Sequence, residues 1–288
     1  MELISIEGLT KKSLPFEETL VIPLGDIQLQ QNRDAVDIKG LKRAVDFGVA
    51  HNAWFLGMGD YIDLESPSNR RALMQSGVYD SVVDALDAKA EELEDELKDI
   101  LAPTVGRWLG LLEGHHYHVH QDGTTSDTRL AHFLKAPFLG TSAYVNLSFT
   151  SNKHTIHHNI WCHHGRAGGK LLSTPLNQLE QLTKGFDADT YLVGHHHKAV
   201  HGVSSRVYPL FVGRTEPTLH HKDIHLACTG SFLKGYVERH KVDGRSSGLY
   251  AERGMMNPLA LRSLRIWFRP RWEGSKSGNP RLDVTIEA

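Results

Sequence analysis

Cysteine is scarce in this sequence, with only Cys162 and Cys228 among 288 residues. Two cysteines cannot form the disulfide framework of a small secreted domain, so a reducing compartment, the cytoplasm, is the expected location. The sequence also lacks an apolar run of the roughly 20 residues that a membrane span needs. Its N-terminus shows no basic segment followed by a long apolar stretch, which is the pattern of a signal peptide. We therefore expect a globular protein that does not enter a membrane.

Charge of one sign does not dominate the whole chain, whose formal net charge is −2. The halves nevertheless differ: residues 1–144 carry 13 Lys and Arg against 23 Asp and Glu, and residues 145–288 carry 19 against 11. Nine acidic residues lie between Asp80 and Asp99, a density that is typical of a solvated helix face. The basic C-terminal half favours an anionic substrate only if its charges cluster in space.

Short apolar runs that end in Gly-Asp or before histidine recur along the chain and are typical of buried strands. The runs at 19–25 and 54–58 flank a helical pattern at 37–50, together the length of a βαβ unit. Further strands are predicted at 108–112, 142–150, 154–162 and 189–193. Helices are predicted at 83–100 and about 170–184. The first of these helices is acidic and either packs on its own domain or pairs with a second subunit, so a homodimer is one expectation.

The C-terminal part, residues 199–288, is predicted to be rich in strands, at 207–212, 225–227, 261–268 and 282–286. A glycine-bounded stretch at 274–278 is typical of a hairpin turn. We find no linker, internal repeat or low-complexity tract. The sequence therefore predicts one domain over residues 1–288, with its motifs in 20–197.

Histidine is abundant, at 19 of 288 residues, and many histidines stand with aspartates where predicted strands end. These residues are Asp26, Asp60, His115, His116, His163, His164, His195 and His197. Because ligands bind beyond the carboxyl ends of strands in open α/β sheets, we expect these side chains to converge. Carboxylate and imidazole together suit Mn²⁺, Fe, Zn²⁺ or Ni²⁺ better than Mg²⁺ or Ca²⁺. The pattern therefore predicts a transition-metal site.

Five motifs in order resemble those of the calcineurin-like metallophosphoesterases. They are Asp26-Ile-Gln28, Gly59-Asp60-Tyr-Ile-Asp63, Gly114-His115-His116, His164-Gly165 and Gly194-His195-His196-His197. The family pattern is DxH, GDxxD, GNH followed by Asp or Glu, a lone His before Gly, and GHxH. The match spans residues 20–197, about 60% of the chain. The resemblance implies a four-layer α/β/β/α sandwich of the metallophosphoesterase type, with mixed sheets and a dinuclear metal site.

Carried over residue by residue, the resemblance implies two divalent ions, with Mn²⁺ expected ahead of Zn²⁺, Fe or Ni²⁺. The first ion would bind Asp26, Gln28, Asp60 and His197, and the second would bind Asp60, His115, His164 and His195. Gln28 and His115 depart from the family, which has histidine and asparagine there. A Gln carbonyl is a weaker ligand than imidazole, so we hypothesise that the first ion is held less tightly than the second.

His116 matches the family's non-ligand histidine, which resembles a proton donor to the leaving group or a clamp on the phosphate. The family usually follows it with a carboxylate, where this chain has Tyr117. Either another acid orients His116 or the residue acts mainly as a hydrogen-bond donor. Asp63, His163 and His196 are expected to support the ligands. Arg166 is either a contact of the substrate phosphate or a surface arginine.

The implied reaction is hydrolysis of a phosphate ester or diester by a metal-activated water, without a covalent enzyme intermediate. Cations and aromatics alternate near the C-terminus, as on single-stranded nucleic-acid surfaces, although alternate residues of a strand face opposite ways. They are Arg262, Arg265, Trp267, Phe268, Arg269, Arg271 and Trp272. The leading function is a phosphodiesterase or nuclease acting on DNA, RNA or a nucleotide. The alternatives are a phosphomonoesterase and a catalytically inactive metal-binding scaffold.

Overall fold

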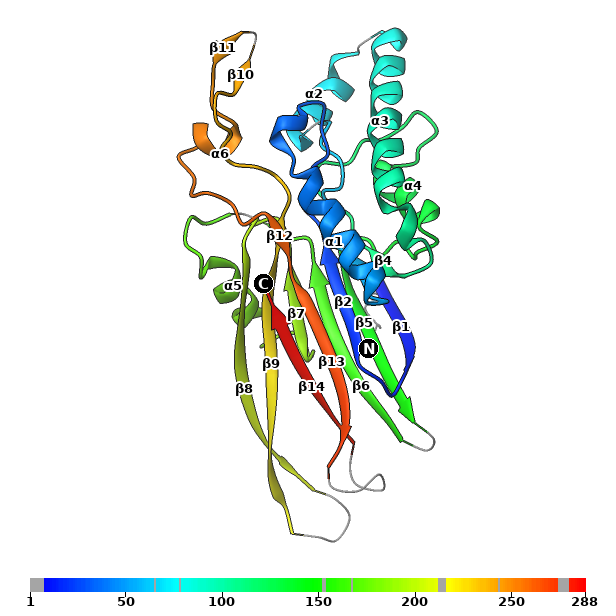
Figure 1. Ribbon diagram of the computed structural model, residues 1–288, viewed down its shortest axis with the longest axis vertical. Coiled ribbons are helices and arrows are strands. Elements are labelled where there is room, and N and C mark those ends of the chain that lie inside the picture. The colour runs from blue at the N-terminus through cyan, green and yellow to red at the C-terminus, as the bar shows by residue number, and fades with distance from the viewer. Residues whose placement is uncertain are drawn as a thin grey trace.

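The computed structural model describes residues 8–64, 66–77, 79–151, 154–166, 168–211, 216–242, 244–273 and 280–288. Within these ranges, two β-sheets pack face to face, and helices cover their outer faces (Figure 1). Both sheets contain parallel and antiparallel strand pairs. The expected α/β class with mixed sheets is confirmed.

The larger sheet has seven strands and contributes two strand ends to the site. In spatial order it contains β1 (Gly8–Pro15), β5 (Ser142–Ser151), β6 (His154–His163), β7 (Thr190–Val193), β9 (Thr218–Ser231) and β12 (Arg262–Ser263), with β8 (Ala199–Leu210) paired to β9. Strands β6, β7 and β9 are parallel, so their carboxyl ends lie at one edge.

The smaller sheet has five strands and contributes three strand ends to the site. Its spatial order is β14 (Pro280–Glu287), β13 (Arg265–Trp272), β2 (Thr19–Leu24), β3 (Trp54–Gly57) and β4 (Trp108–Leu111). Strands β2, β3 and β4 are parallel. The C-terminal strand β13 pairs antiparallel with β2, so the C-terminal part of the chain completes this sheet.

Helices occupy both outer layers. They are α1 (Ile38–Ala50), α2 (Pro67–Ser76), α3 (Asp80–Leu101), α4 (Ser126–Phe133), α5 (Thr174–Leu182) and α6 (Tyr250–Arg253). Two 3₁₀ turns, η1 (Arg33–Ala35) and η2 (Ala102–Thr104), and the small hairpin β10 (Lys241–Val242) and β11 (Arg245–Ser246) complete the described elements. None of the helices in the described ranges is both long and apolar enough to cross a membrane.

The core has one layer between the sheets and one on each outer face, because successive residues of a buried strand point to opposite faces. Val21 and Leu56 face the larger sheet, whereas their neighbours Ile22 and Phe55 pack under α1, α3 and α4. On the larger sheet, Trp161 packs with α5. These layers make the α/β/β/α order that the resemblance implies.

The acidic helix α3 packs on its own chain rather than standing free. Its buried face contains Leu93, Leu97 and Leu101, within the core under the smaller sheet. The period of 3 and 4 residues seen in the sequence is the period of this buried face. Its remaining acidic residues lie largely on the solvent side, except Glu94, which is buried.

The basic and aromatic C-terminal segment is mainly strand β13, whose residues alternate between two faces. Arg265, Trp267, Arg269 and Arg271 share one face, and Ile266 and Phe268 lie on the other. Phe268 is buried between the sheets. Arg269 pairs with Glu18, and Arg271 pairs with Asp283 at 3.2 Å. Ion pairs occupy two of the three arginines on that face, which weakens the face as a reason to prefer nucleic acid. The predicted turn at 274–278 lies outside the described residues.

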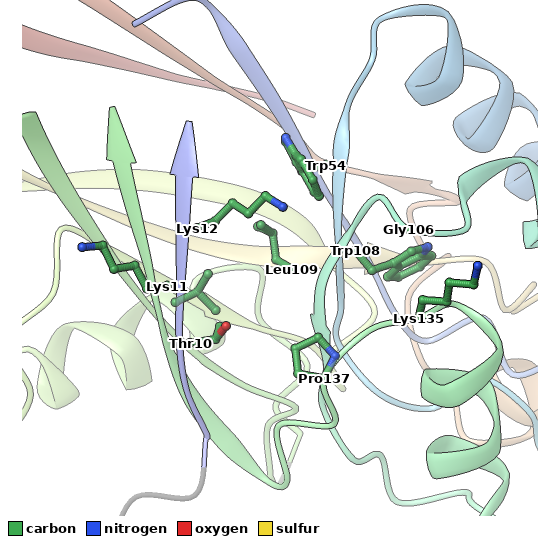
Figure 2. A pocket seen from close by; sticks show the side chains of 10 residues that line it. Thr10, Lys11, Lys12, Trp54, Gly106, Trp108, Leu109, Lys135 and Pro137 are labelled. Carbon is green, nitrogen blue, oxygen red and sulfur yellow. The ribbon is translucent and has the colours of Figure 1, made fainter. Parts of the chain in front are cut away.

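A cavity of about 230 Å³ opens at the far end of the strands from the candidate ligands (Figure 2). Trp54 and Trp108, the first residues of β3 and β4, line it together with Lys12 of β1. The Lys12 ammonium lies 3.7 Å from the centre of the Trp54 ring. Because the candidate ligands follow the last residues of β3 and β4, this cavity is separate from their site.

Candidate metal centre

Five strand ends bring the candidate ligands together. The residues that follow β2, β3, β4, β6 and β7 are, in that order, Asp26, Asp60, His115, His164 and the pair His195 and His197. The two sheets meet here, because Asp26 Oδ2 after β2 accepts the backbone N–H of His195 after β7 at 2.8 Å. The site therefore lies at one edge of the sandwich, as strand order predicts.

The backbone at the site is strained. Five candidate ligands have left-handed backbone: Asp26 (φ 48°), Gln28 (47°), Asp60 (54°), His195 (61°) and His197 (53°). The left-handed region costs roughly 1–2 kcal/mol for a residue with a Cβ atom. Such strain persists only where surrounding contacts enforce it, and it concentrates at functional sites.

Glycines at the strand ends permit this crowding. A Cβ atom at Gly114 would lie 2.1 Å from the backbone nitrogen of Asp60. A Cβ atom at Gly59, where φ is 90°, would lie 2.6 Å from His164 Nδ1. The glycines before Asp60 and His115 are therefore required by the close approach of neighbouring motifs.

Four of the candidate ligands form one close group. Asp60, His115, His164 and His195 each offer one ligand atom, and these atoms all lie within 4.8 Å of one another. His164 Nε2 lies 3.2 Å from Asp60 Oδ2, and the Nδ1 atoms of His115 and His195 are 3.3 Å apart. The four residues are those that the resemblance assigns to the second ion. One carboxylate and three imidazoles form a typical donor set for a transition ion.

The electrostatics of this group centre on Asp60. Burial alone would raise the pKa of the Asp60 carboxyl, but His164 and His116 together outweigh it and hold that pKa well below its ordinary value. Burial opposes protonation of His164, and Asp60 overrides it and raises the pKa of His164 to about 9. Burial, reinforced by His164, lowers the pKa of His195 to about 4. The group therefore combines a fixed negative charge with a neutral imidazole at His195.

The residues assigned to the first ion are arranged differently. His197 Nε2 lies 3.3 Å from Asp26 Oδ1. Gln28, however, directs its amide nitrogen to Asp60 Oδ2 at 3.3 Å. The glutamine therefore donates a hydrogen bond to the shared carboxylate, whereas a ligand would present an oxygen to an ion.

His116 has an acid partner that sequence reasoning left open. Its Nδ1 lies 2.8 Å from Asp63 Oδ1, four residues from the start of the GDxxD motif. Burial lowers the pKa of His116, but the Asp63 carboxylate and then Asp60 raise it above the ordinary value. Asp63 thus supplies the carboxylate that the family has directly after this histidine.

The remaining predicted residues lie around the ligands. His163 Nδ1 accepts the backbone N–H of Gly165 at 2.7 Å, which turns its ring onto its own loop. His196 Nε2 lies 3.0 Å from Gln178 Oε1 on α5, and burial lowers the pKa of His196 to about 4. Arg166 is exposed at the turn after His164.

Two residues that the sequence did not single out hold the loop after β4. Buried Asp127 accepts the backbone N–H of Gly114 through Oδ2 at 2.9 Å, and burial raises the pKa of Asp127 to about 7. Arg70 of α2 donates to the carbonyl oxygens of His115 and Tyr117, both at 2.8 Å. No local signal marks them, because an aspartate in a helix-start sequence and an arginine on a helix are common surface residues.

Comparison with solved structures finds matches over most of the chain at low sequence identity. Vps29 from Cryptosporidium parvum is 11% identical over 94% of this chain and 99% of that chain, with a TM-score of 0.36. Vps29 from Entamoeba histolytica, solved in complex with Zn²⁺, is 12% identical over 93% and 99%, with a TM-score of 0.38. A predicted phosphoesterase from Streptococcus pneumoniae TIGR4 is 10% identical over 93% and 98%, with a TM-score of 0.33.

The sequence matches no protein-family model and no curated protein. At identities of 10–12% and TM-scores below 0.4, these matches say nothing about the chemistry of this chain. The chemistry of the site therefore rests on the residues of this chain.

Proposed function

We propose that this chain is a metal-dependent phosphoesterase that hydrolyses phosphodiester bonds at the candidate metal centre. The observation that carries the proposal is the convergence of Asp60, His115, His164 and His195 beside the His116–Asp63 pair. A metal-binding donor set and an oriented proton donor are the two parts that such hydrolysis needs.

The residues of the centre fit a divalent transition ion. Asp26 Oδ1 and His164 Nε2 are buried and make no hydrogen bond, although buried polar atoms are normally paired. Asp26 Oδ1 faces His197 Nε2 at 3.3 Å, and His164 Nε2 faces Asp60 Oδ2 at 3.2 Å. Such separations suit two ligands that lie about 2.1 Å from a shared ion. Asp60, His115, His164 and His195 would hold one ion, and Asp26, Asp60 and His197 would hold another, to which Gln28 would add its oxygen only after a turn of its amide.

When bound, the metal would supply positive charge to the phosphoryl oxygens and an acidified water as nucleophile. The chain itself would supply the proton for the leaving group. Because Nδ1 of His116 faces Asp63, the proton available to an alcohol leaving group is the one on Nε2. Asp63 fixes the ring orientation and favours the charged form of His116.

A diester of a nucleotide or nucleic acid is the substrate class that we propose. The support is the donor set itself, since ion pairs already occupy Arg269 and Arg271 of strand β13. Exposed Arg166, next but one to the candidate ligand His164, is a cation that could contact a phosphate. The buried free thiols of Cys162 and Cys228 support the proposed cytoplasmic location.

One observation favours a second function, a metal-binding scaffold without turnover. Gln28 turns its amide nitrogen toward Asp60, so the first ion would lack a ligand as the side chain stands. A centre that holds a single ion would bind metal and lose the paired-metal clamp on the phosphate.

A turnover assay separates these functions. The purified chain with Mn²⁺ is offered bis-p-nitrophenyl phosphate, p-nitrophenyl phosphate, and labelled single- and double-stranded DNA. The Asp60→Asn variant tests the centre, and Asp46→Asn, an exposed aspartate of α1, is the matched control. We expect diester cleavage that Asp60→Asn abolishes and Asp46→Asn retains. Cleavage of the monoester alone would indicate a phosphatase, and metal binding without any cleavage would indicate the scaffold.

A further inference from the structure

A second cluster of histidines and carboxylates lies away from the candidate centre, between α3 and the loop that joins β4 to α4. In the sequence, His118 and His120 follow the third motif with a spacing of two. That spacing fits either residues that line the cleft or ordinary polar residues of a loop. Both side chains are buried against α3 instead. His118 Nε2 lies 2.7 Å from Asp87 Oδ1, and His120 Nε2 lies 2.6 Å from Glu94 Oε1.

Three of these residues share the geometry of metal ligands. Asp87, His118 and His120 each offer one ligand atom, and these atoms lie within 4.8 Å of one another. The imidazole rings of His118 and His120 stand at 90° with their centres 4.8 Å apart, so both rings can direct a nitrogen to a common point.

The unpaired Nδ1 atom of His120 indicates that a ligand binds in this cluster. It is buried, and it makes no hydrogen bond, while the side chain of His120 is 1% exposed. Asp87 Oδ1 lies 3.8 Å from it, which is too far for a hydrogen bond. Two atoms at that separation can both reach one ion at about 2.0–2.2 Å.

Glu94 fixes the state of His120 that a metal requires. Because His120 Nε2 faces the Glu94 carboxylate, the ring proton stays on Nε2 and the lone pair of Nδ1 points toward Asp87. Metal-bound histidines usually donate their second N–H to a carboxylate in this way. Glu94 is itself held by Lys98, whose Nζ lies 3.5 Å from Glu94 Oε2.

The loop backbone presents the two histidines without strain. His120 donates its N–H to the carbonyl of Thr124 at 2.9 Å, and Ser126 donates to the carbonyl of His118 at 3.0 Å. Asp87 Oδ2 accepts the N–H of Gln121 at 3.1 Å, which leaves Oδ1 directed at the histidines. Contacts of the loop and of α3 therefore position the three side chains without a bound ion.

We propose that Asp87, His118 and His120 bind a divalent transition ion of the Zn²⁺ type, with water as a fourth ligand and Glu94 orienting His120. The ion cross-links α3 to the loop that begins with His115 and His116. It is a structural ion that is separate from the candidate centre, and the proposal does not depend on the proposed function.

The test measures Zn²⁺ bound per chain and leaves activity aside. In an Asp60→Asn background, which weakens the candidate centre, Asp87→Asn is compared with Asp95→Asn, an exposed aspartate on the same helix. We expect the Asp87→Asn chain to bind one Zn²⁺ fewer after dialysis and to lose the visible absorption of Co²⁺ substituted at this site. Equal Zn²⁺ content and equal Co²⁺ absorption in the two variants would overturn the proposal. The cluster would then be a network of ion pairs that binds no metal.

The Glu94→Gln variant provides a second measurement if Asp87→Asn does not fold. Loss of an orienting partner typically weakens metal affinity by about 10–100-fold. We expect the dissociation constant for Zn²⁺ in the Asp60→Asn background to rise by that factor, and we expect Zn²⁺ to raise the unfolding temperature less. An unchanged dissociation constant would contradict the assignment.

Discussion

The chain holds two histidine–carboxylate clusters that differ in the backbone carrying them. In the candidate centre, Asp60 and His195 lie on turns directly after strands and have left-handed backbone. In the cluster at α3, Asp87 lies within a helix, and neither His118 nor His120 has a positive φ. The side chains are of the same types, whereas the conformational energy stored around them differs.

This difference suggests different roles for the two clusters. A strained ligand is held in place by its surroundings, which favours one fixed geometry even when substrate arrives. An unstrained cluster on a helix gains its order from ordinary loop contacts, and an ion there adds stability. We therefore assign chemistry to the strand ends and cross-linking to α3.

The largest expected effect separates the two clusters directly. We expect Asp60→Asn to lower turnover by more than the roughly 10–100-fold that loss of an outer metal partner costs. Asp87→Asn should leave turnover within a few-fold and lower the unfolding temperature in the presence of Zn²⁺. The measurements are initial rates on bis-p-nitrophenyl phosphate and thermal unfolding with and without chelator. If the two variants changed rate and stability alike, the division of roles would be wrong.

A buried histidine outside both clusters, His158, sharpens the comparison because its ring nitrogen faces a hydroxyl group. His158 Nε2 lies 2.8 Å from Thr190 Oγ1, and burial lowers the pKa of His158 to about 4. The unfolded chain takes up a proton near pH 6.5, and the folded chain does not do so until about pH 4. The free energy of unfolding should therefore fall by about 3 kcal/mol as the pH drops through this window.

The matched variant for that measurement is His158→Gln. It cannot titrate, so its free energy of unfolding in urea should fall less than that of the wild type between pH 7 and pH 4. Parallel pH dependences in the two proteins would mean that His158 takes up its proton in the folded state as easily as in the unfolded chain.

Much of the fold could be predicted because its strands are buried on both faces. The apolar run at 19–25 is β2, all six of whose residues are buried, and the run at 54–58 is β3. The prediction failed where one face is exposed. Strands β8 and β9 extend well beyond the predicted 207–212 and 225–227, of which position 212 lies outside the described residues. The missed residues 199–206 of β8 and 218–223 of β9 mix polar and apolar types without a clear apolar run. Strand β1, with three lysine and serine residues among eight, was missed for the same reason.

The site could be predicted to the level of which residues meet, and less well to the level of their hydrogen bonds. Parallel strands place Asp60 and His164 at the same edge, whichever rotamers their side chains adopt. The pairing of His116 with Asp63 and the turn of Gln28 toward Asp60 depend on rotamers, which sequence spacing does not determine. His118 and His120 pack against α3 because Asp87 and Glu94 of that helix pair with their ring nitrogens. The sequence spacing of the two histidines does not reveal these partners.

The pairing of His116 with Asp63 gives the next effect in size. Asp63→Asn keeps the shape of the side chain but removes the negative charge that orients the His116 ring and raises its pKa. We expect kcat to fall by roughly 10–100-fold while KM changes little, because an orienting partner acts mainly in the chemical step. Steady-state kinetics on the diester measures both constants. A rise in KM at constant kcat would instead place Asp63 in substrate binding.

The smallest effect concerns Gln28 and tests the asymmetry within the candidate centre itself. Gln28 donates to Asp60 Oδ2, the oxygen that also faces His164, so the glutamine occupies part of the shared carboxylate. Gln28→His replaces that donor with an imidazole, and histidine tolerates the left-handed backbone at this position. We expect the variant to hold an additional Mn²⁺ per chain after dialysis, with a gain in diester turnover that is smaller than the loss in Asp63→Asn. Wild-type protein that already retained two ions at the centre would show that the amide turns its oxygen to the metal, and the split in affinity would then be wrong.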